Sequence, residues 1–315
     1  MEEASILQLF FEKPYFKKMG TKELSRRLKV SEEIILKVRR EFSKQKKESV
    51  PRIENPPKVD SRKILFLDIE TAPMVGYVWG RWKQNISINQ TVSEWFMLSW
   101  AGKWANQDEV LSDVLTPQEA LQEDDLRISK SLWEVLNQAD VVITHNGIRF
   151  DHPKINTRFL IHGLPPTRPF RIIDTLKEVK HTFSFSSNKL DNIMIQLNVD
   201  RKLETSFELW KKCLQGDQES LNYMEEYNQY DVVGLEKVFA KLKPWIRNLP
   251  HFTLYNTVEP GERVCPSCGG VHLKEDGIYT TSVNRYKLYR CQDCQSLSRE
   301  RVGEKMKIPL TNNIR

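Results

Sequence analysis

The sequence predicts a mixed α/β fold with a small module at each end. Strand-like segments come first, over residues 64–69, 75–80 and 95–104, and strand-like and helix-like segments then alternate. Strands followed by such an alternation are typical of a mixed sheet flanked by helices. A chain of 315 residues is long enough for one sizeable core and two appendages.

The later elements follow from apolar periodicity and from short apolar runs. The expected elements are helices near 129–138, over 152–162, over 188–197 and from about 217 to 242, and strands in ADVVITHN (139–146) and FRIID (170–174). In the last helix, Val232, Leu235 and Phe239 indicate that one face packs on the sheet.

The composition is that of a soluble globular protein, with 39% hydrophobic and 29% charged residues. No stretch approaches the ~20 consecutive apolar residues of a membrane span. The N-terminal MEEASILQLFF is acidic before its short apolar run, unlike a secretory signal. We therefore expect a cytoplasmic protein with no membrane partner.

Positive charge is concentrated at the N-terminal end. Residues 1–63 hold 17 Lys/Arg against 10 Asp/Glu, although the whole chain has a net charge of only +6. Such a surplus suggests an acidic partner, most often nucleic acid, and a solvated surface is the alternative. Residues 44–61, rich in proline and charge, are predicted to form a linker to the domain over 62–248.

Residues 1–43 are predicted to form a helical module. TKELSRRLKVSEEIILKVRREFSK gives two short helices, with Thr21 and Ser31 as N-caps, joined as in a helix-turn-helix. The basic residues expected on the second, groove-entering helix are Lys37, Arg39 and Arg40. A helical hairpin that docks on the main domain or on another protein remains an alternative.

Two acids one residue apart interrupt the first apolar strand, ILFLDIETAP (64–73). Asp68 and Glu70 point to the same face because side chains alternate along a strand. Two desolvated carboxylates repel unless a cation lies between them. They therefore either end the strand in solvent or hold a metal.

Two later segments supply two more acids. THNGIRFDHPKIN places Asp151 at the start of a helix, and in YNQYD the residues Tyr227 and Asp231 share one helix face. Four carboxylates meeting at one edge of the sheet suit a hard divalent cation. Two such cations about 4 Å apart can bind the attacking water and the leaving oxygen of a phosphodiester.

The motifs DxE, FD and YxxxD, in this order along the chain, resemble those of the DEDD 3′–5′ exonucleases, which have a ribonuclease H-like fold. Tyr227, four residues before the last acid, resembles the tyrosine that marks the Tyr-bearing subgroup of these enzymes. The likeness covers about residues 62–245 and includes YVWGRWKQN, SNKLDNI and MEEYNQYDVVGLEKV. It is closest to a phage- and prophage-associated branch with a zinc ribbon behind the nuclease. That branch implies a bacterial or phage-infected host cell.

The resemblance implies a role for each of these residues. Asp68, Glu70 and Asp231 would bind a first catalytic Mg²⁺ or Mn²⁺. Asp68 would also bridge to a second, to which Asp151 contributes directly or through water. Tyr227 would orient the attacking water, and its ordinary pKa near ~10 makes it a poor base alone.

Several neighbouring residues have two readings. Asn146 contacts the substrate or is a turn residue, and Lys189 contacts a phosphate or is solvated. The residues Arg149 and Arg158 have the same two readings as Lys189. Asp174 is either a recurring acid of the family or a helix N-cap, and His145 is expected to fix the strand end. The residues expected to be core or loop anchors rather than base-stacking platforms are Trp79, Trp82, Trp95, Trp100 and Trp104.

Four of the five cysteines form two CxxC pairs separated by 22 residues: Cys265, Cys268, Cys291 and Cys294. Two such knuckles joined by a hairpin predict one tetrahedral, structural Zn²⁺ in a zinc ribbon over 262–300, followed by a tail over 301–315. A DG turn (276–277) is expected in the hairpin. The ribbon would track nucleic acid or bind a protein; its basic residues are Arg285, Lys287, Arg290, Arg299 and Arg301. Cys213 is expected to be a buried apolar residue.

Together these features predict a metal-dependent 3′–5′ exonuclease that acts by a two-metal mechanism, on DNA rather than RNA. Its end modules would bind nucleic acid, and a replication or recombination protein is a candidate partner. The alternatives are a ribonuclease or a structure-specific endonuclease on the same fold, or a catalytically silent DNA-binding adaptor.

Overall fold

The computed structural model describes residues 20–48, 63–105, 107–199, 203–247, 249–251, 263–281 and 284–305. The chain divides into two compact units, Met1–Pro57 and Lys58–Arg315. The start of the predicted N-terminal module, most of the predicted linker and the end of the predicted tail lie outside the described residues. Among the described helices, none combines the length and the apolar character that crossing a membrane requires.

The first unit contains the two predicted helices, α2 (Thr21–Leu28) and α3 (Glu32–Glu48). Leu24, Ile35 and Val38 are buried against one another. Ser31 acts as predicted, since its hydroxyl accepts from the Ile34 amide at 3.4 Å. Thr21 is instead the first helical residue, after the N-cap Gly20. α3 continues into the predicted linker because residues 44–48 contain neither glycine nor proline.

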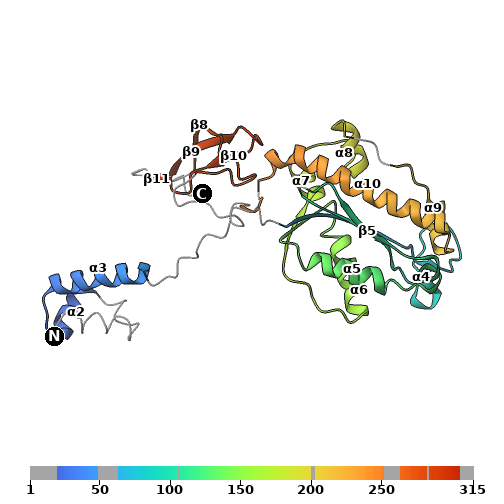
Figure 1. Ribbon diagram of the computed structural model, residues 1–315, viewed down its shortest axis with the longest axis horizontal. Coiled ribbons are helices and arrows are strands. Elements are labelled where there is room, and N and C mark those ends of the chain that lie inside the picture. The colour runs from blue at the N-terminus through green and yellow to red at the C-terminus, as the bar shows by residue number, and fades with distance from the viewer. Residues whose placement is uncertain are drawn as a thin grey trace. The chain divides into compact units, whose positions relative to one another are not determined.

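The second unit is built on a five-stranded mixed sheet, which confirms the predicted α/β class (Figure 1). Its strands, in spatial order, are β5 (Val110–Val114), β4 (Met97–Trp104), β1 (Ile64–Thr71), β6 (Val141–Thr144) and β7 (Arg171–Asp174). The strands β1, β6 and β7 are parallel, whereas β4 runs antiparallel to both β1 and β5. In the spatial order, β1 is the central strand of the sheet.

Helices cover both faces of this sheet (Figure 1). Leu65, Leu67 and Ile69 pack in a core cluster that includes α5 (Leu126–Leu136) and α6 (Asp151–Ile161). Phe66 faces the other way, and its ring meets Phe239 of the long helix α10 (Gln218–Leu242) at 5.8 Å. Because side chains alternate along β1, the positions after Phe66 on the α10 face are 68 and 70.

The remaining helices are short and connect or buttress the layers: α4 (Pro117–Gln122), α7 (Thr175–Thr182), α8 (Leu190–Gln196), α9 (Phe207–Leu214) and the 3₁₀ turns η2 (Ile88–Gln90) and η3 (Lys243–Trp245). The helix α7 is the one that the N-cap interpretation of Asp174 implies, but neither β5 nor the helices α4 and α9 was expected from the sequence. Each is shorter than nine residues, so its periodicity is too brief to stand out.

The expected strand over 75–80 is reduced to a two-residue β2 (Val75–Gly76), paired with β3 (Thr91–Ser93). The pairing register shifts between Val75 and Gly76, and β2 ends at Gly76. Trp79 and Trp82 are 97% and 85% exposed, so the expectation that they anchor the core or a loop is wrong. Trp100, at 3% exposure, is a core residue as predicted.

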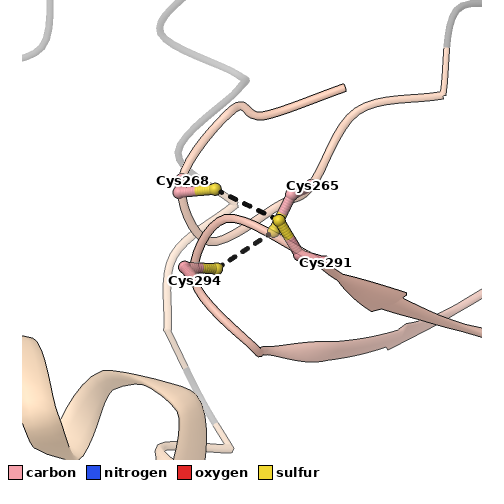
Figure 2. Close-up of side chains that lie close together, drawn as sticks. All are labelled: Cys265, Cys268, Cys291 and Cys294. Carbon is pink, nitrogen blue, oxygen red and sulfur yellow. Dashed lines mark hydrogen bonds between the residues drawn. The ribbon is translucent and has the colours of Figure 1, made fainter. Parts of the chain in front are cut away.

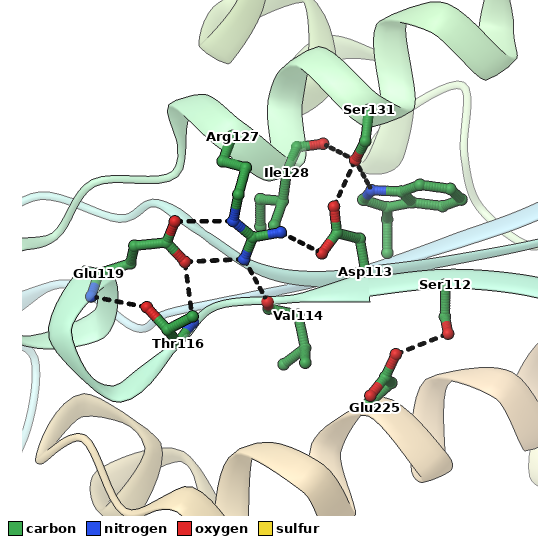
Figure 3. Close-up of polar contacts among 10 residues, drawn as sticks. Ser112, Asp113, Val114, Thr116, Glu119, Arg127, Ile128, Ser131 and Glu225 are labelled. Atoms are coloured by element: carbon green, nitrogen blue, oxygen red, sulfur yellow. Dashed lines mark hydrogen bonds and ion pairs between the residues drawn. The ribbon is translucent and has the colours of Figure 1, made fainter.

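An ion-pair network fastens α5 to the sheet edge (Figure 3). The Arg127 guanidinium donates to Asp113 of β5 and to Glu119 of α4, and also to the Val114 carbonyl at 2.8 Å. The hydrogen bond from Arg127 lowers the pKa of Glu119 to about 2. Glu119 also completes the capping box with Thr116 at the start of α4. The Arg127 guanidinium therefore joins α5 to both α4 and β5.

The C-terminal module is a small sheet around β9 (Asn284–Cys291), which pairs with all three of its other strands: β8 (Leu273–Thr280), β10 (Leu297–Arg299) and β11 (Glu304–Lys305). The expected DG turn is wrong. Gly277 adopts a φ of +97° inside β8, where the register shifts between Glu275 and Ile278. This pair therefore forms a bulge, because glycine tolerates that backbone conformation.

Candidate active site

The residues predicted as catalytic line one cleft of about 920 Å³: Asp68, Glu70, Asp151, Tyr227 and Asp231. The two residues predicted to contact substrate, Asn146 and Lys189, line the same cleft. The cleft lies where β1, the start of α6 and the middle of α10 meet. The structure thus brings together side chains that are up to 163 positions apart in the sequence.

Three of these acids form a compact cluster. Asp68, Glu70 and Asp231 each offer a carboxylate oxygen, and these atoms all lie within 4.8 Å of one another. The first two acids come from adjacent same-face positions of β1, and the third comes from the helix that packs on that face. A donor set of three carboxylates fits a hard divalent cation such as Mg²⁺ or Mn²⁺.

Asn228 supports this cluster and was missed by sequence reasoning. It is fully buried, and its side-chain amide donates to Asp68 Oδ2 at 2.7 Å. Its own Oδ1 accepts from the Ser99 hydroxyl of β4 at 3.1 Å, which fixes the orientation of the amide. Asn228 precedes Asp231 by three residues, a helical spacing that could have indicated a shared face.

Asp151 lies apart from the three-acid cluster and is the most deeply buried acid of the cleft, with 2% exposure. Its Oδ1 accepts from the Ile69 amide of β1 at 3.1 Å, so it lies against the strand between the two β1 acids. Burial raises the pKa of Asp151 to about 7, against the opposing effect of that hydrogen bond. The nearby charge of Asp174 contributes to this rise in the pKa of Asp151.

Tyr227 lies at the inner wall of the cleft. Its ring is 6% exposed and meets the Trp210 ring of α9 edge-on, with centroids 6.3 Å apart. One helical turn separates it from Asp231 on α10. The side chain is therefore held in place by packing as well as by the helix.

The turn after β6 is organised by Asp174. Its carboxylate accepts from the backbone amides of Asn146 and Ile148 and also caps α7. Asp174 is therefore an N-cap, one of the two readings that its sequence position left open. Asn146 itself has a φ of +73°, typical of a turn residue, and also faces the cleft. His145 bridges Thr175 and the Asn188 carbonyl, each at 2.9 Å, and fixes the strand end as expected.

The basic residues differ in their roles. Lys189, the exposed N-cap of α8, lines the cleft, as does Lys180 of α7, which was not predicted. Arg158 is buried and paired with Asp125 at 2.6 Å, so a phosphate contact is excluded for it. Arg149 is exposed.

The four cysteines of the two CxxC motifs lie close together in the C-terminal module (Figure 2). The distance is 3.7 Å between the Sγ atoms of Cys265 and Cys294 and 3.6 Å between those of Cys268 and Cys291. The edge of a tetrahedron with Zn–S bonds of ~2.3 Å is about 3.8 Å, so the donor set fits zinc.

The environment of the cysteines is also tightly built. A Cβ atom on Gly270 would lie 2.0 Å from Asp293 Oδ2 and 3.3 Å from Cys268 Sγ, so a larger residue there would displace the Asp293 side chain. Cys213, outside the module, is fully buried as expected, and burial raises its pKa to about 12. Three of the module's basic residues are ion-paired: Lys287 with Glu275, Arg290 with Asp276 and Arg263 with Glu300.

The match to a protein family agrees with this architecture. A family model described as the RNase_H superfamily matches residues 100–243. No curated protein matches the chain. Among solved structures, a family B DNA polymerase from the hyperthermophilic archaeon Pyrobaculum calidifontis is similar with a TM-score of 0.45 and 15% identity, over 72% of this chain and 32% of that one. This chain thus spans about a third of that polymerase. The family match and the mixed sheet flanked by helices show that the chain contains a ribonuclease H-like domain.

Proposed function

We propose that the chain is a divalent-cation-dependent nuclease, and specifically a 3′–5′ exonuclease of the DEDD type acting on DNA. The observation that supports this most strongly is the cluster of Asp68, Glu70 and Asp231 in a cleft of a ribonuclease H-like domain. Three carboxylates gathered from two elements form a ligand set for a cation, and the cleft provides room for a strand end.

Asp68, Glu70 and Asp231 would hold the first Mg²⁺ or Mn²⁺, with Asp68 and Asp151 reaching a second. Bound cations neutralise the acids, lower the pKa of a water and polarise the phosphoryl oxygen. The chain's own residues set the geometry around them. Asn228 donates to the Asp68 carboxylate, and Tyr227, whose ring packs against Trp210, would orient the attacking water.

The approach of a phosphodiester is favoured by the charges at the rim. Lys180 and Lys189 are exposed and line the same cleft as the acids. Such contacts add affinity for phosphates without reading sequence. The acids thus carry the chemistry, and the two lysines attract the strand.

The four cysteines would hold one structural Zn²⁺. Since all four positions of a tetrahedron are then filled by thiolates, no position remains for substrate. We propose that this module and the α2–α3 unit contribute to nucleic-acid binding, with the latter carrying the surplus of positive charge.

The test uses single-stranded DNA labelled at either the 5′ or the 3′ end, with Mn²⁺, Mg²⁺ or EDTA. The proposal predicts a cation-dependent ladder from the 5′ label and early mononucleotide release from the 3′ label. Asp68→Asn should slow cleavage about 100-fold or more, because cation stabilisation is worth several kcal/mol. Asp108→Asn, at an exposed acid, is the matched control.

Cuts inside the labelled strand would show that the enzyme is an endonuclease rather than an exonuclease. Matched RNA cleaved in preference to DNA would reassign the substrate. Binding of DNA or RNA without cleavage of either would indicate a catalytically silent adaptor.

A further inference from the structure

The loop between β2 and β3 exposes aromatic rings. We call residues 75–93 the aromatic loop. Its residues Tyr77, Trp79 and Trp82 are 76%, 97% and 85% exposed. Scattered apolar residues on a surface are ordinary, but three large rings within six positions form a patch of the kind that marks an interaction site.

The loop backbone is held by polar groups rather than by these rings. The Tyr77 amide donates to the Gln90 carbonyl at 2.9 Å, and the Gln90 side chain donates back to the Tyr77 carbonyl at 3.0 Å. Ser87 forms a capping box with Gln90, and the Gln84 side chain donates to the Trp82 carbonyl at 2.7 Å. The loop therefore has a defined conformation in which the rings stay in solvent.

The charge of the loop favours nucleic acid as the occupant. Residues 72–93 include Arg81 and Lys83 but no acidic residue. Arg81 lies between the two tryptophans, and Lys83 follows the second. Aromatic rings interleaved with cations suit single strands, whose unpaired bases stack while the phosphates meet positive charge.

The position of the loop relates it to the acid cleft. Strand β1, which carries Asp68 and Glu70, ends at Thr71, four residues before the loop begins. Residues flanking the loop, Met74 and Trp95, line a second cleft of about 440 Å³. This second cleft adjoins the acid cleft, since Thr205 lines both.

We propose that Tyr77, Trp79 and Trp82 stack on unpaired bases of single-stranded nucleic acid outside the acid cleft, with Arg81 and Lys83 at the phosphates. The inference rests on the proposed function in one respect, namely that the strand held by the loop is the one whose end enters the acid cleft. Stacking on rings does not select sequence, so the loop serves as a general strand holder.

The test measures binding rather than cleavage. Fluorescein-labelled oligothymidylate of about 20 nucleotides, longer than one typical single-strand site, is titrated with full-length protein in EDTA and followed by anisotropy. Trp79→Ala/Trp82→Ala should weaken binding about 25-fold or more, because each of the two stacked bases contributes about fivefold or more. Trp79→Phe/Trp82→Phe keeps stacking rings and should bind within about threefold of wild type.

Ile88→Ala is the matched control, since Ile88 is 91% exposed in the same loop but has no ring. Its oligonucleotide binding should be unchanged. Since all these side chains are exposed, thermal unfolding should show that every variant is folded.

Wild-type binding that is retained by Trp79→Ala/Trp82→Ala, or lost equally in Ile88→Ala, overturns the inference. The inference would also be overturned if the double variant bound the oligonucleotide as wild type does but no longer formed a dimer that wild type forms. That result would assign the loop to contact with a second copy of the chain. Binding is measured without a cation, so a wild type that binds through the tryptophans but cleaves nothing refutes only the nuclease proposal.

Discussion

Replacing Asp151 by asparagine should stabilise the cation-free protein at high pH. The carboxyl is buried, and its pKa rises from 3.8 to about 7. At about 1.4 kcal/mol per pKa unit, ionising this group in the folded state costs at most about 4 kcal/mol. Asn keeps an oxygen that can accept from the Ile69 amide but carries no charge.

The sign follows from proton binding. Because the folded state holds the Asp151 proton more tightly than the unfolded state, stability falls as the pH rises from about 4 to about 7 and then levels off. Asp151→Asn lacks this loss. The stability of the variant relative to wild type should therefore grow by up to about 4 kcal/mol between pH 4 and pH 8.

The assay is calorimetric or fluorescence-detected unfolding in EDTA at several pH values. For a domain of this size, about 1 kcal/mol corresponds to a shift in Tm of about 2–4 °C. Asp108→Asn serves as a control for the loss of an exposed acid. A difference between variant and wild type that stays constant across this range would refute the burial argument. Saturating Mn²⁺ should stabilise wild type more than the variant, and so reduce the difference in Tm between the two proteins at high pH.

Three further outcomes are expected. Asn228→Ala removes the hydrogen bond to Asp68 and should weaken Mn²⁺ binding, followed by calorimetric titration, about 10- to 100-fold; unchanged affinity would contradict the orienting role. Cys291→Ser should lower the zinc content from one per chain, measured by elemental analysis, while the Tm of the nuclease domain is unchanged; wild type purified without zinc would contradict the site. Arg127→Met should destabilise the second unit by about 1 kcal/mol, since its ion pairs are partly solvated; denaturant unfolding with an unchanged midpoint would exclude a structural contribution.

Much of the site could be predicted because the chemistry left a pattern in the sequence. Two acids two positions apart in an apolar strand, and a tyrosine four residues before an acid in a helix, are spacings that place side chains on one face. All five predicted residues meet in one cleft. The cysteine cluster could be predicted for the same reason, since the two cysteines of each CxxC pair are close in the sequence. Only the sheet that brings the two pairs together depends on contacts between distant residues.

What could not be predicted depends on contacts between distant segments. Arg158 looks like a phosphate ligand until its buried partner Asp125, 33 positions away, is seen. The exposure of Trp79 and Trp82 was missed because aromatic residues are enriched in strands. Only the early end of β2 shows that this segment leaves the sheet. Asn228 was overlooked because an asparagine in a helix gives no signal until Asp68, 160 positions away, is beside it.

The most direct test of the site is the role of Asp231, the acid that folding alone brings to the pair on β1. Cleavage of 5′-labelled single-stranded DNA in Mn²⁺ should be compared between wild type and Asp231→Asn, with unfolding curves to show that both are folded. If the three acids form one cation site, wild type shortens the strand and the variant is at least about 100-fold slower. A folded Asp231→Asn that cleaves at the wild-type rate would show that the chemistry does not depend on this cluster.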